Sequence, residues 1–269
     1  MWRPRRDRRQ RGDGSGGSVP NIERAAPFEI DAGVEAGIVL IHGFTGAPQE
    51  VEPIASALAE QGVSSIGPLL PGHGSEVSRL NRVDWRAWTG AVEDAYREAR
   101  RRWGSVLVGG LSMGGGLALH LAAHHSAALR GAVALATPLR LHHLALPILP
   151  WLSRVIDSTT KKGIGISDPA LARARVSYDR RPLAGALQLD RFLGALRQEL
   201  HAVTCPLFLA HSRGDHAIPF SSMGEIVAGV SSRSIDTLEL SRSDHILPLD
   251  VEREQLIERI VRFVLANLD

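Results

Sequence analysis

The sequence predicts an α/β fold in which a mostly parallel, twisted sheet carries helices on both faces. From about residue 28 to the end of the chain, short apolar runs alternate with amphipathic stretches. Strands joined through helices form right-handed crossovers, which set consecutive strands parallel to one another. With 269 residues, 44% of them hydrophobic, the chain can supply the sizeable core that this fold needs.

The first half of the predicted fold alternates strands and helices. "GIVLIHG" is a β-rich run that ends in glycine, and the stretch after it has apolar residues at helical spacing until Gly62 stops it. Asp84 is a plausible N-cap for the long amphipathic stretch that follows it. The predicted elements are strand 37–43, helix 48–62, strand 63–68, helix 84–104, strand 105–110, helix 115–125 and strand 131–138.

The alternation stops over residues 139–185, which are irregular and begin with the apolar, proline-containing stretch "LHHLALPILPWL". We expect these residues to form a small inserted lid over the carboxyl edge of the sheet, where ligands bind in open α/β folds. The regular pattern then returns, and it predicts helix 186–200, strand 205–212, helix 221–230, strand 234–240 and helix 250–268. The sequence therefore predicts one domain over residues 28–269, with the insertion inside it.

The basic character of the chain lies at its N-terminus. Residues 1–18 contain six arginines and two aspartates, and the remaining chain has 25 basic and 27 acidic residues. A segment rich in Arg, Gly and Ser cannot bury enough apolar surface to fold, so residues 1–27 are predicted to be a disordered tail. Because the folded part is slightly acidic, we expect no nucleic-acid partner.

Composition also limits the other partners and the location. Cys205 is the one cysteine, so an intramolecular disulfide and a multi-cysteine metal site are both excluded, and we expect it to be a small buried side chain. No apolar run reaches the roughly 18 residues of a transmembrane helix. No apolar segment of a secretion signal follows the arginines, which favours a cytoplasmic location.

The stretch "GGLSMGGG" carries the strongest chemical signal. Gly110-Leu111-Ser112-Met113-Gly114 matches the pattern G-x-S-x-G between a predicted strand and a predicted helix. A sharp strand-to-helix turn strains the backbone at the nucleophile, and glycines two residues to either side avoid a collision within the turn. The positive end of the following helix would favour a developing oxyanion. The alternative is a tight glycine turn in which the serine is incidental.

A serine hydroxyl needs a base to accept its proton. Where the nucleophile occupies such a turn, its partners follow in the order Ser, acid, His. The loop "HSRGDHAIP" offers Asp215, and the loop "LSRSDHILPLD" offers Asp244 and Asp250. His245 is the predicted base and Asp215 the residue that orients it. His216 directly follows Asp215, and Asp244 directly precedes His245. Neighbours in the chain are badly placed to share a hydrogen bond while the histidine also reaches Ser112.

Asp250 is expected to be the N-cap of the last helix.

The remaining histidines are expected to have roles other than catalysis. His120, His124 and His125 lie late in a helix, and no carboxylate is evident in the sequence to complete a metal site with the first two. His142 and His143 could line an entrance, and His201 and His211 have no identifiable partner. His73 in "PGHG" is expected to pack near the site.

The loop "IHGFTG" supplies the remaining part of the predicted site. Its backbone can face the serine turn, so the oxyanion would be held by the N–H groups of Phe44 and of Met113, the residue after the nucleophile. His42 and Gly43 are expected to shape this turn. No metal or organic cofactor is required for the chemistry.

Five motifs in this order resemble the bacterial carboxylesterases and monoacylglycerol lipases of the α/β-hydrolase fold: "HGFTG", "PGHG", "GLSMGG", "RGDHAIP" and "SDHILPLD". The resemblance covers about residues 35–268. It implies Ser112 as nucleophile, Asp215 as acid and His245 as base, with Phe44 and Met113 as oxyanion donors and a lid between the strand ending near Thr137 and the helix beginning near Ala186.

The function predicted from these observations is hydrolysis of carboxylic esters with short to medium acyl chains, including monoacylglycerols, through an acyl-enzyme. The partner is then a small ester or lipid. A thioesterase, a lysophospholipase or a C–C hydrolase could use the same residues. A thioesterase for acyl-CoA would need a basic entrance, for which Arg140, Arg154, Lys161 and Lys162 are candidates. The remote alternative is a non-catalytic binding protein.

Overall fold

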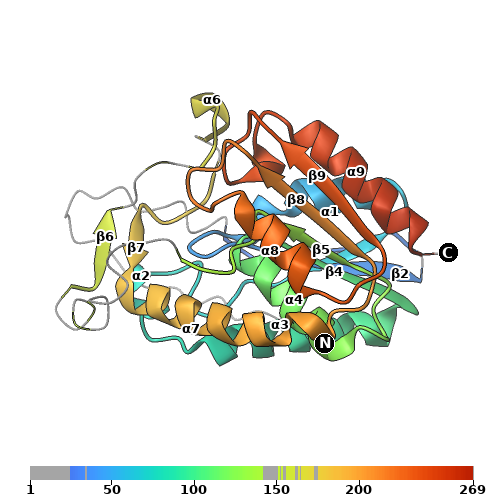
Figure 1. The fold of residues 1–269 in the computed structure, drawn as a ribbon, viewed down its shortest axis with the longest axis horizontal. Coiled ribbons are helices and arrows are strands. Elements are labelled where there is room, and N and C mark those ends of the chain that lie inside the picture. The colour runs from blue at the N-terminus through green and yellow to red at the C-terminus, as the bar shows by residue number, and fades with distance from the viewer. Residues whose placement is uncertain are drawn as a thin grey trace, which may run out of the picture.

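The computed structural model describes residues 25–33, 35–141, 156–160, 165–172 and 175–268, with the single residues 151, 153 and 163. The predicted disordered tail lies almost entirely outside the described residues. A seven-stranded sheet forms the centre of the molecule (Figure 1). Its strands, in spatial order, are β1 (Phe28–Ile30), β3 (Ser64–Gly67), β2 (Ala36–Ile41), β4 (Ser105–Leu111), β5 (Ala132–Leu135), β8 (Leu207–Ser212) and β9 (Ile235–Leu240).

Neighbouring strands from β3 to β9 pair in parallel, as the alternation of apolar runs and helical stretches predicts. The exception is β1, which pairs antiparallel with β3 at the edge of the sheet. It has three residues, too few for any periodicity, and the sequence gives no separate signal for it.

Helices cover both faces of the sheet (Figure 1). α1 (Glu52–Ala59) contacts α9 (Arg253–Ala266) on one face, while α3 (Trp85–Arg102), α4 (Met113–His125) and α7 (Leu183–Glu199) contact one another on the other. α8 (Ser221–Gly229) contacts β8, and a short α2 (Val77–Leu80) precedes α3. The predicted N-cap of α3 is confirmed, because the Asp84 side chain accepts a hydrogen bond from the Arg86 N–H.

The core has two halves, one on each face of the sheet. Along β2, Ile38 faces the cluster that includes α1 and α9, and the next residue, Val39, faces the cluster that includes α3, α4 and α7. Trp88 of α3 and Phe192 of α7 are fully buried in the second cluster. Since both faces of the sheet are covered, the strands are continuous apolar runs rather than alternating ones.

Several predicted boundaries are wrong by two or three residues. α4 begins at Met113 rather than near Gly115, because the chain turns at Ser112 itself and the glycines belong to the first helical turn. α7 begins at Leu183, directly after a short strand, and α9 begins at Arg253 rather than at residue 250. Helix ends depend on local hydrogen bonds that apolar periodicity does not report.

The described part of the insertion contains regular elements that the sequence did not predict. β6 (Ser158–Thr160) and β7 (Arg180–Pro182) pair antiparallel, and α6 (Pro169–Ala172) lies between them in the chain. In Figure 1, β6 and β7 lie side by side at the left of the view, and α6 lies apart from them at the top. The apolar stretch at 142–150 and its histidines, His142 and His143, lie outside the described residues.

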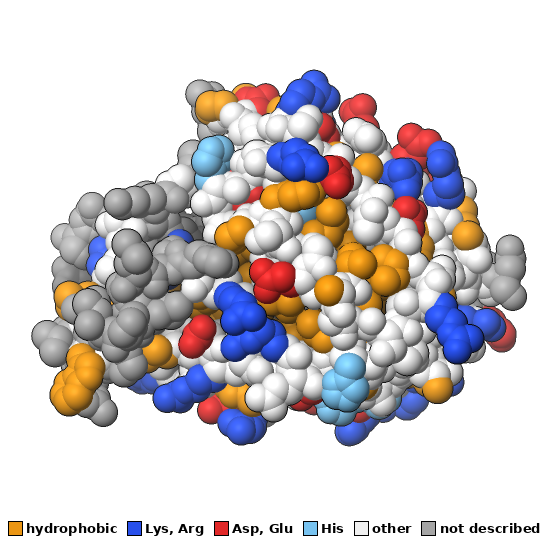
Figure 2. All heavy atoms as spheres, in the orientation of Figure 1, with side chains coloured by type: hydrophobic (Ala, Val, Ile, Leu, Met, Phe, Trp, Pro, Cys, Tyr) orange, Lys and Arg blue, Asp and Glu red, His pale blue; other side chains and the backbone are white. Residues whose placement is uncertain are grey.

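The visible surface carries both signs of charge. Figure 2 shows Lys and Arg side chains interspersed with Asp and Glu over this face of the described residues, without a large patch of one sign. Arg140, one of the candidates for a basic entrance, forms an exposed ion pair with Glu225, whereas Arg154, Lys161 and Lys162 lie outside the described residues. Among the described residues, no helix combines the length and the apolarity needed to cross a bilayer.

Candidate active site

Ser112 occupies the sharp turn between β4 and α4. Its backbone has φ 56° and ψ −118°, which lies in the left-handed half of the map where non-glycine residues are rare. A Cβ on Gly110 would lie 2.3 Å from the carbonyl carbon of Gly114, and one on Gly114 would lie 2.1 Å from the carbonyl oxygen of Ile41. Both glycines are therefore required by the close approach of the backbone at this turn.

Three predicted side chains form one hydrogen-bonded chain at the carboxyl ends of β4, β8 and β9. His245 Nδ1 lies 2.8 Å from Asp215 Oδ2, and His245 Nε2 lies 3.0 Å from Ser112 Oγ. An ionised carboxylate only accepts hydrogen bonds, so Nδ1 carries the proton and Nε2 is left to accept from the serine hydroxyl. In this tautomer the imidazole can remove the Ser112 proton.

Asp215 is held in its charged form by an unusually complete set of donors. Its Oδ1 accepts hydrogen bonds from the N–H groups of Ala217 and Ile218, both at 2.8 Å, and its side chain is fully buried. Burial acts to raise the pKa of Asp215, but hydrogen bonds from His211, His245 and Ile218 outweigh it and hold the pKa well below its ordinary value. The carboxylate is thus fixed as an acceptor for His245.

His211 is a member of this site that the sequence analysis missed, because it was left without a partner. Its Nε2 lies 3.2 Å from Asp215 Oδ2 and 3.2 Å from the carbonyl oxygen of Ile218. A carbonyl can only accept, so Nε2 carries the proton of this buried ring and donates. The one available signal was that His211 ends an apolar strand four residues before the candidate acid.

We expect His211→Phe to lower the free energy of unfolding by about 2 kcal/mol, because it deletes a buried hydrogen bond to a charged group. It should also lower kcat/KM several-fold, since Asp215 orients His245 less firmly. Urea unfolding and ester hydrolysis measure the two effects. His211→Gln, which keeps a donor, should recover part of both, and the exposed His201→Ala should change neither. Unchanged stability in His211→Phe would show that this contact contributes nothing.

The prediction that Asp250 caps the last helix is wrong. Asp250 is fully buried, and its Oδ2 accepts hydrogen bonds from the N–H groups of Ser167 and Asp244, at 2.8 and 2.7 Å. The residue at the N-cap of α9 is Glu252, whose carboxylate instead accepts from the backbone of residues 241–243. The two carboxylates therefore hold the loop that carries His245, which explains why neither caps the helix.

The loop with Phe44 lies against the serine turn. A Cβ on Gly43 would be 3.5 Å from the Ser112 Cβ, and the Gly46 N–H donates to the Gly43 carbonyl at 3.1 Å, which closes a turn around Phe44 and Thr45. Thr45 has a positive φ of 62°. Phe44, half-buried, is thus presented at the edge of the site, and Met113 is buried at the start of α4.

Two histidines hold this loop, as expected for His42 and His73. His73 Nε2 accepts from the Thr45 N–H at 3.1 Å. His42 Nε2 accepts from the Leu70 N–H at 3.2 Å, while its Nδ1 donates to the Gly43 carbonyl. Burial lowers the pKa of His42, although the hydrogen bond to Gly43 and the charge of Glu50 oppose the shift. A neutral His42 can make both bonds at once.

Glu50 connects the same loop to the inserted segment. It is almost fully buried and accepts a hydrogen bond from the Gly43 N–H at 3.2 Å. Arg175 donates to Glu50 Oε1 from Nε at 2.9 Å and from Nη2 at 2.7 Å. Tyr178 adds a bond from its backbone N–H to the Thr45 carbonyl at 3.2 Å. Residues 175–178 are therefore fastened to the loop that carries Phe44.

The other end of this segment contacts the loop of His245. The Ile246 N–H donates to the Gly165 carbonyl at 2.7 Å, and the Ser167 hydroxyl donates to the Arg242 carbonyl at 2.8 Å. Gly165 has φ 73°, and a Cβ there would lie 3.5 Å from the His245 Cβ. Residues of the insertion thus border the site from both sides.

The remaining sequence candidates lie apart from this arrangement. His216 is exposed, with its Nδ1 3.5 Å from Asp244 Oδ1, and Cys205 is buried as expected. The expectation that no carboxylate completes a set with His120 and His124 is wrong, because Glu199 from α7 lies 2.6 Å from His120 Nδ1. The two helices are far apart in sequence, so the proximity could not be seen there.

Comparison with known proteins agrees with this geometry. Residues 32–250 match the family described as serine aminopeptidase, S33 (Hydrolase_4). The chain is 32% identical to a thermostable monoacylglycerol lipase of Bacillus sp. (strain H-257), over 91% of this chain and 96% of the relative. It is 25% identical to a carboxylesterase of Bacillus subtilis (strain 168), over 90% and 97% of the two chains.

Among solved structures, the chain resembles one described under LipS and LipT, two metagenome-derived lipolytic enzymes. The TM-score is 0.85 and the identity 26%, with 90% of this chain and 98% of the other covered. The similarity thus extends over nine-tenths of this chain.

Proposed function

Because this chain belongs to the serine aminopeptidase S33 (Hydrolase_4) family and has the α/β-hydrolase fold, we propose that it is a serine esterase whose substrates are monoacylglycerols. The coarser statement, that it is a carboxylic ester hydrolase, rests on two relatives that match over nine-tenths of the chain. The observation that carries the chemistry is the hydrogen-bonded chain Asp215–His245–Ser112 at the serine turn.

In the proposed first step, Ser112 Oγ attacks the ester carbonyl carbon while its proton passes to His245 Nε2. The imidazole becomes positively charged, and Asp215 stabilises that charge through its hydrogen bond to Nδ1. The tetrahedral intermediate collapses when His245 returns the proton to the leaving alcohol, glycerol in the case of a monoacylglycerol. Ser112 is then acylated, and the C–O bond to the alcohol is broken.

In the second step, water takes the place of the alcohol. His245 removes a proton from the water as it attacks the acyl carbon, and the proton then goes to Ser112 Oγ as the acid leaves. We propose that the N–H groups of Phe44 and Met113 hold the negatively charged oxygen in both steps. The contact of the Gly43 loop with Ser112, and the position of Met113 at the start of α4, support these two roles.

The test of the substrate proposal is a comparison of kcat/KM among 1-monoacylglycerols, ethyl esters and p-nitrophenyl esters, each from two to sixteen acyl carbons. We expect a defined chain-length optimum, with the monoacylglycerol of that length preferred over the ethyl ester of the same acid. Di- and triacylglycerols provide the matched comparison for the size of the alcohol. An equal rate on ethyl and glyceryl esters would reduce the proposal to a general carboxylesterase.

Two further substrates separate the alternatives that share the residues. An acyl-CoA tests the thioesterase alternative, and an aminoacyl p-nitroanilide tests the peptidase activity in the family description. We expect kcat/KM on both to be far below that on the best ester. Hydrolysis of the anilide at a comparable rate would overturn the proposed function.

A further inference from the structure

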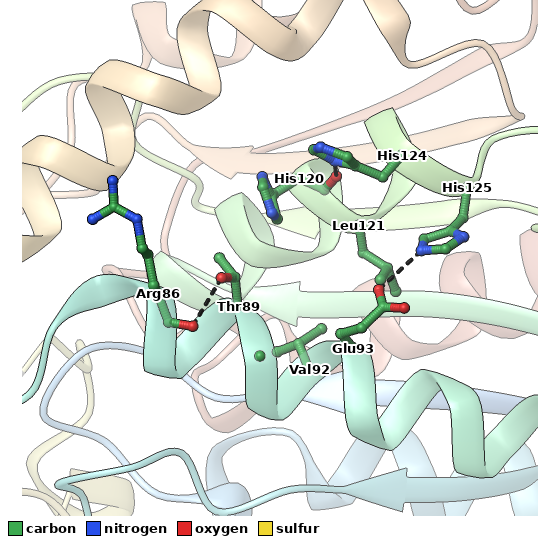
Figure 3. A pocket seen from close by; sticks show the side chains of 9 residues that line it. Arg86, Thr89, Val92, Glu93, His120, Leu121, His124 and His125 are labelled. Carbon is green, nitrogen blue, oxygen red and sulfur yellow. Dashed lines mark hydrogen bonds and ion pairs between the residues drawn. The ribbon is translucent and has the colours of Figure 1, made fainter.

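On the outer side of α4, several histidines face a hollow that the ester chemistry does not use. Figure 3 shows His120, His124 and His125 on α4 across from Thr89 and Glu93 on α3. The hollow has a volume of about 480 Å³. His120 lies eight residues after Ser112, which is about 12 Å along the helix. This side-chain cluster is therefore remote from the serine turn.

We propose that His120, His124 and Glu199 form a binding site for a single divalent transition-metal ion such as Zn²⁺. Each of the three side chains offers one ligand atom, and these three atoms all lie within 4.8 Å of one another. Ligand atoms around a zinc ion at bond lengths of about 2.1 Å are some 3–4 Å apart, so small side-chain rotations complete the set. Water fills the remaining position.

The helical spacing brings the two imidazoles together. His120 and His124 are one turn apart on α4, so both project from the same face of the helix, and their ring centroids are 4.5 Å apart. Two histidines at this spacing, joined by a carboxylate from another element, are a known zinc ligand set. Here the carboxylate comes from Glu199, the last residue of α7.

The hydrogen bonds around the cluster leave lone pairs where an ion would need them. His124 Nδ1 lies 2.9 Å from the carbonyl oxygen of His120, which can only accept, so the lone pair of this ring is on Nε2. His120 Nδ1 and Glu199 Oε2 share one proton across 2.6 Å. When an ion binds Nδ1, the ring proton moves to Nε2, which is the other neutral tautomer of the imidazole.

The surroundings suit a cation. Glu93 is paired with His125 beside the cluster at 2.9 Å and adds a second carboxylate. Arg86 also borders the hollow, but its guanidinium is 3.5 Å from the Asp84 carboxylate and stacks over the Trp85 ring. His124 is exposed, so an ion can reach the site without opening the fold. Imidazole ligands favour zinc, copper or nickel over magnesium.

The consequence of such a site is a link between two helices. α4 carries Ser112 at its start, and α7 follows the inserted segment directly. An ion held by His120, His124 and Glu199 would fix the end of α7 to the C-terminal half of α4. Because the ion binds the folded chain and not the unfolded one, it should raise thermal stability rather than the catalytic rate.

The test uses the untagged full chain, freed of metal with EDTA and titrated with zinc chloride in a calorimeter. We expect one zinc ion per chain, no comparable binding of magnesium, and a rise in Tm of about 5–10 °C at a hundredfold excess of zinc over its Kd. His124→Ala and Glu199→Gln should each weaken binding at least tenfold and remove most of the rise in Tm.

The matched control is His216→Ala, which deletes an exposed histidine outside the cluster and should bind zinc as the unchanged chain does. His124 is exposed, so its variant should fold and hydrolyse esters normally in the absence of metal. No zinc binding by the unchanged chain would overturn the proposal. So would binding that is as tight in both His124→Ala and Glu199→Gln as in the control, because the ion would then be bound elsewhere.

Discussion

Ser112→Ala should lower kcat/KM for a p-nitrophenyl ester by at least about 10⁴-fold. The proposed acyl-enzyme forms on this hydroxyl, and alanine leaves the proposed oxyanion donors and the binding surface in place. Residual catalysis above the rate in water is therefore expected from those groups alone. The measurement is ester hydrolysis at the chain length preferred by the unchanged chain.

The control for this variant is the exposed Ser221→Ala at the start of α8, which should retain full activity. The fold should persist in Ser112→Ala, because the side-chain hydrogen bond that alanine removes is the one to His245. The backbone strain at this position stays, since alanine carries the same Cβ as serine. An active-site fluorophosphonate should label the unchanged chain and not the variant. Activity that persists in Ser112→Ala would show that another residue is the nucleophile.

Asp215→Asn should lower kcat by about 10⁴-fold with little change in the structure of the site. An asparagine amide can face His245 with its N–H₂ group, which would force Nδ1 to accept a hydrogen bond. The ring proton then moves to Nε2, where it faces Ser112, and the base is lost. A steady-state measurement of kcat and KM should show the loss almost entirely in kcat.

The same variant should change how stability depends on pH. The pKa of Asp215 is lower in the folded chain than its unfolded value of about 3.9. A depressed pKa contributes stability that is present above about pH 4 and is lost as the pH falls through the folded value. Urea unfolding of the unchanged chain and Asp215→Asn should therefore differ most near pH 7, and the difference should shrink below pH 4. A constant difference would contradict the assigned environment of Asp215.

The order of elements was predictable because the apolar runs of a doubly covered parallel sheet are distinct in sequence. "SVLVGG" and "CPLFLAHS" each predict a strand that the structure contains as β4 and β8. The edge strand β1 and the pair β6–β7 have three residues each, so no pattern could form. Their pairing depends on contacts between segments distant in the chain, which no local pattern encodes.

The proximity of Ser112, Asp215 and His245 was predictable because the serine turn has a strict local requirement for glycine, and because few acids and histidines follow it. The residues that hold these three side chains and their loops in place were not predicted, for a different reason. His211, Glu50 and Glu252 act through backbone groups or through a carboxylate brought near by folding. Asp250 was misassigned because an aspartate before a helix is a common N-cap, while here burial directs it to the Asp244 and Ser167 N–H groups.

The buried pair between Glu50 and Arg175 limits how this chain could be re-engineered. A chimaera that replaced the inserted segment with a foreign one would separate Glu50 from its guanidinium and leave a carboxylate in the core without a cation. Breaking a buried pair in this way costs about 3–5 kcal/mol, and the loss would fall on the loop of Gly43 and Phe44. Any transplanted segment therefore has to bring an arginine to the position of Arg175, or be combined with an uncharged residue at position 50.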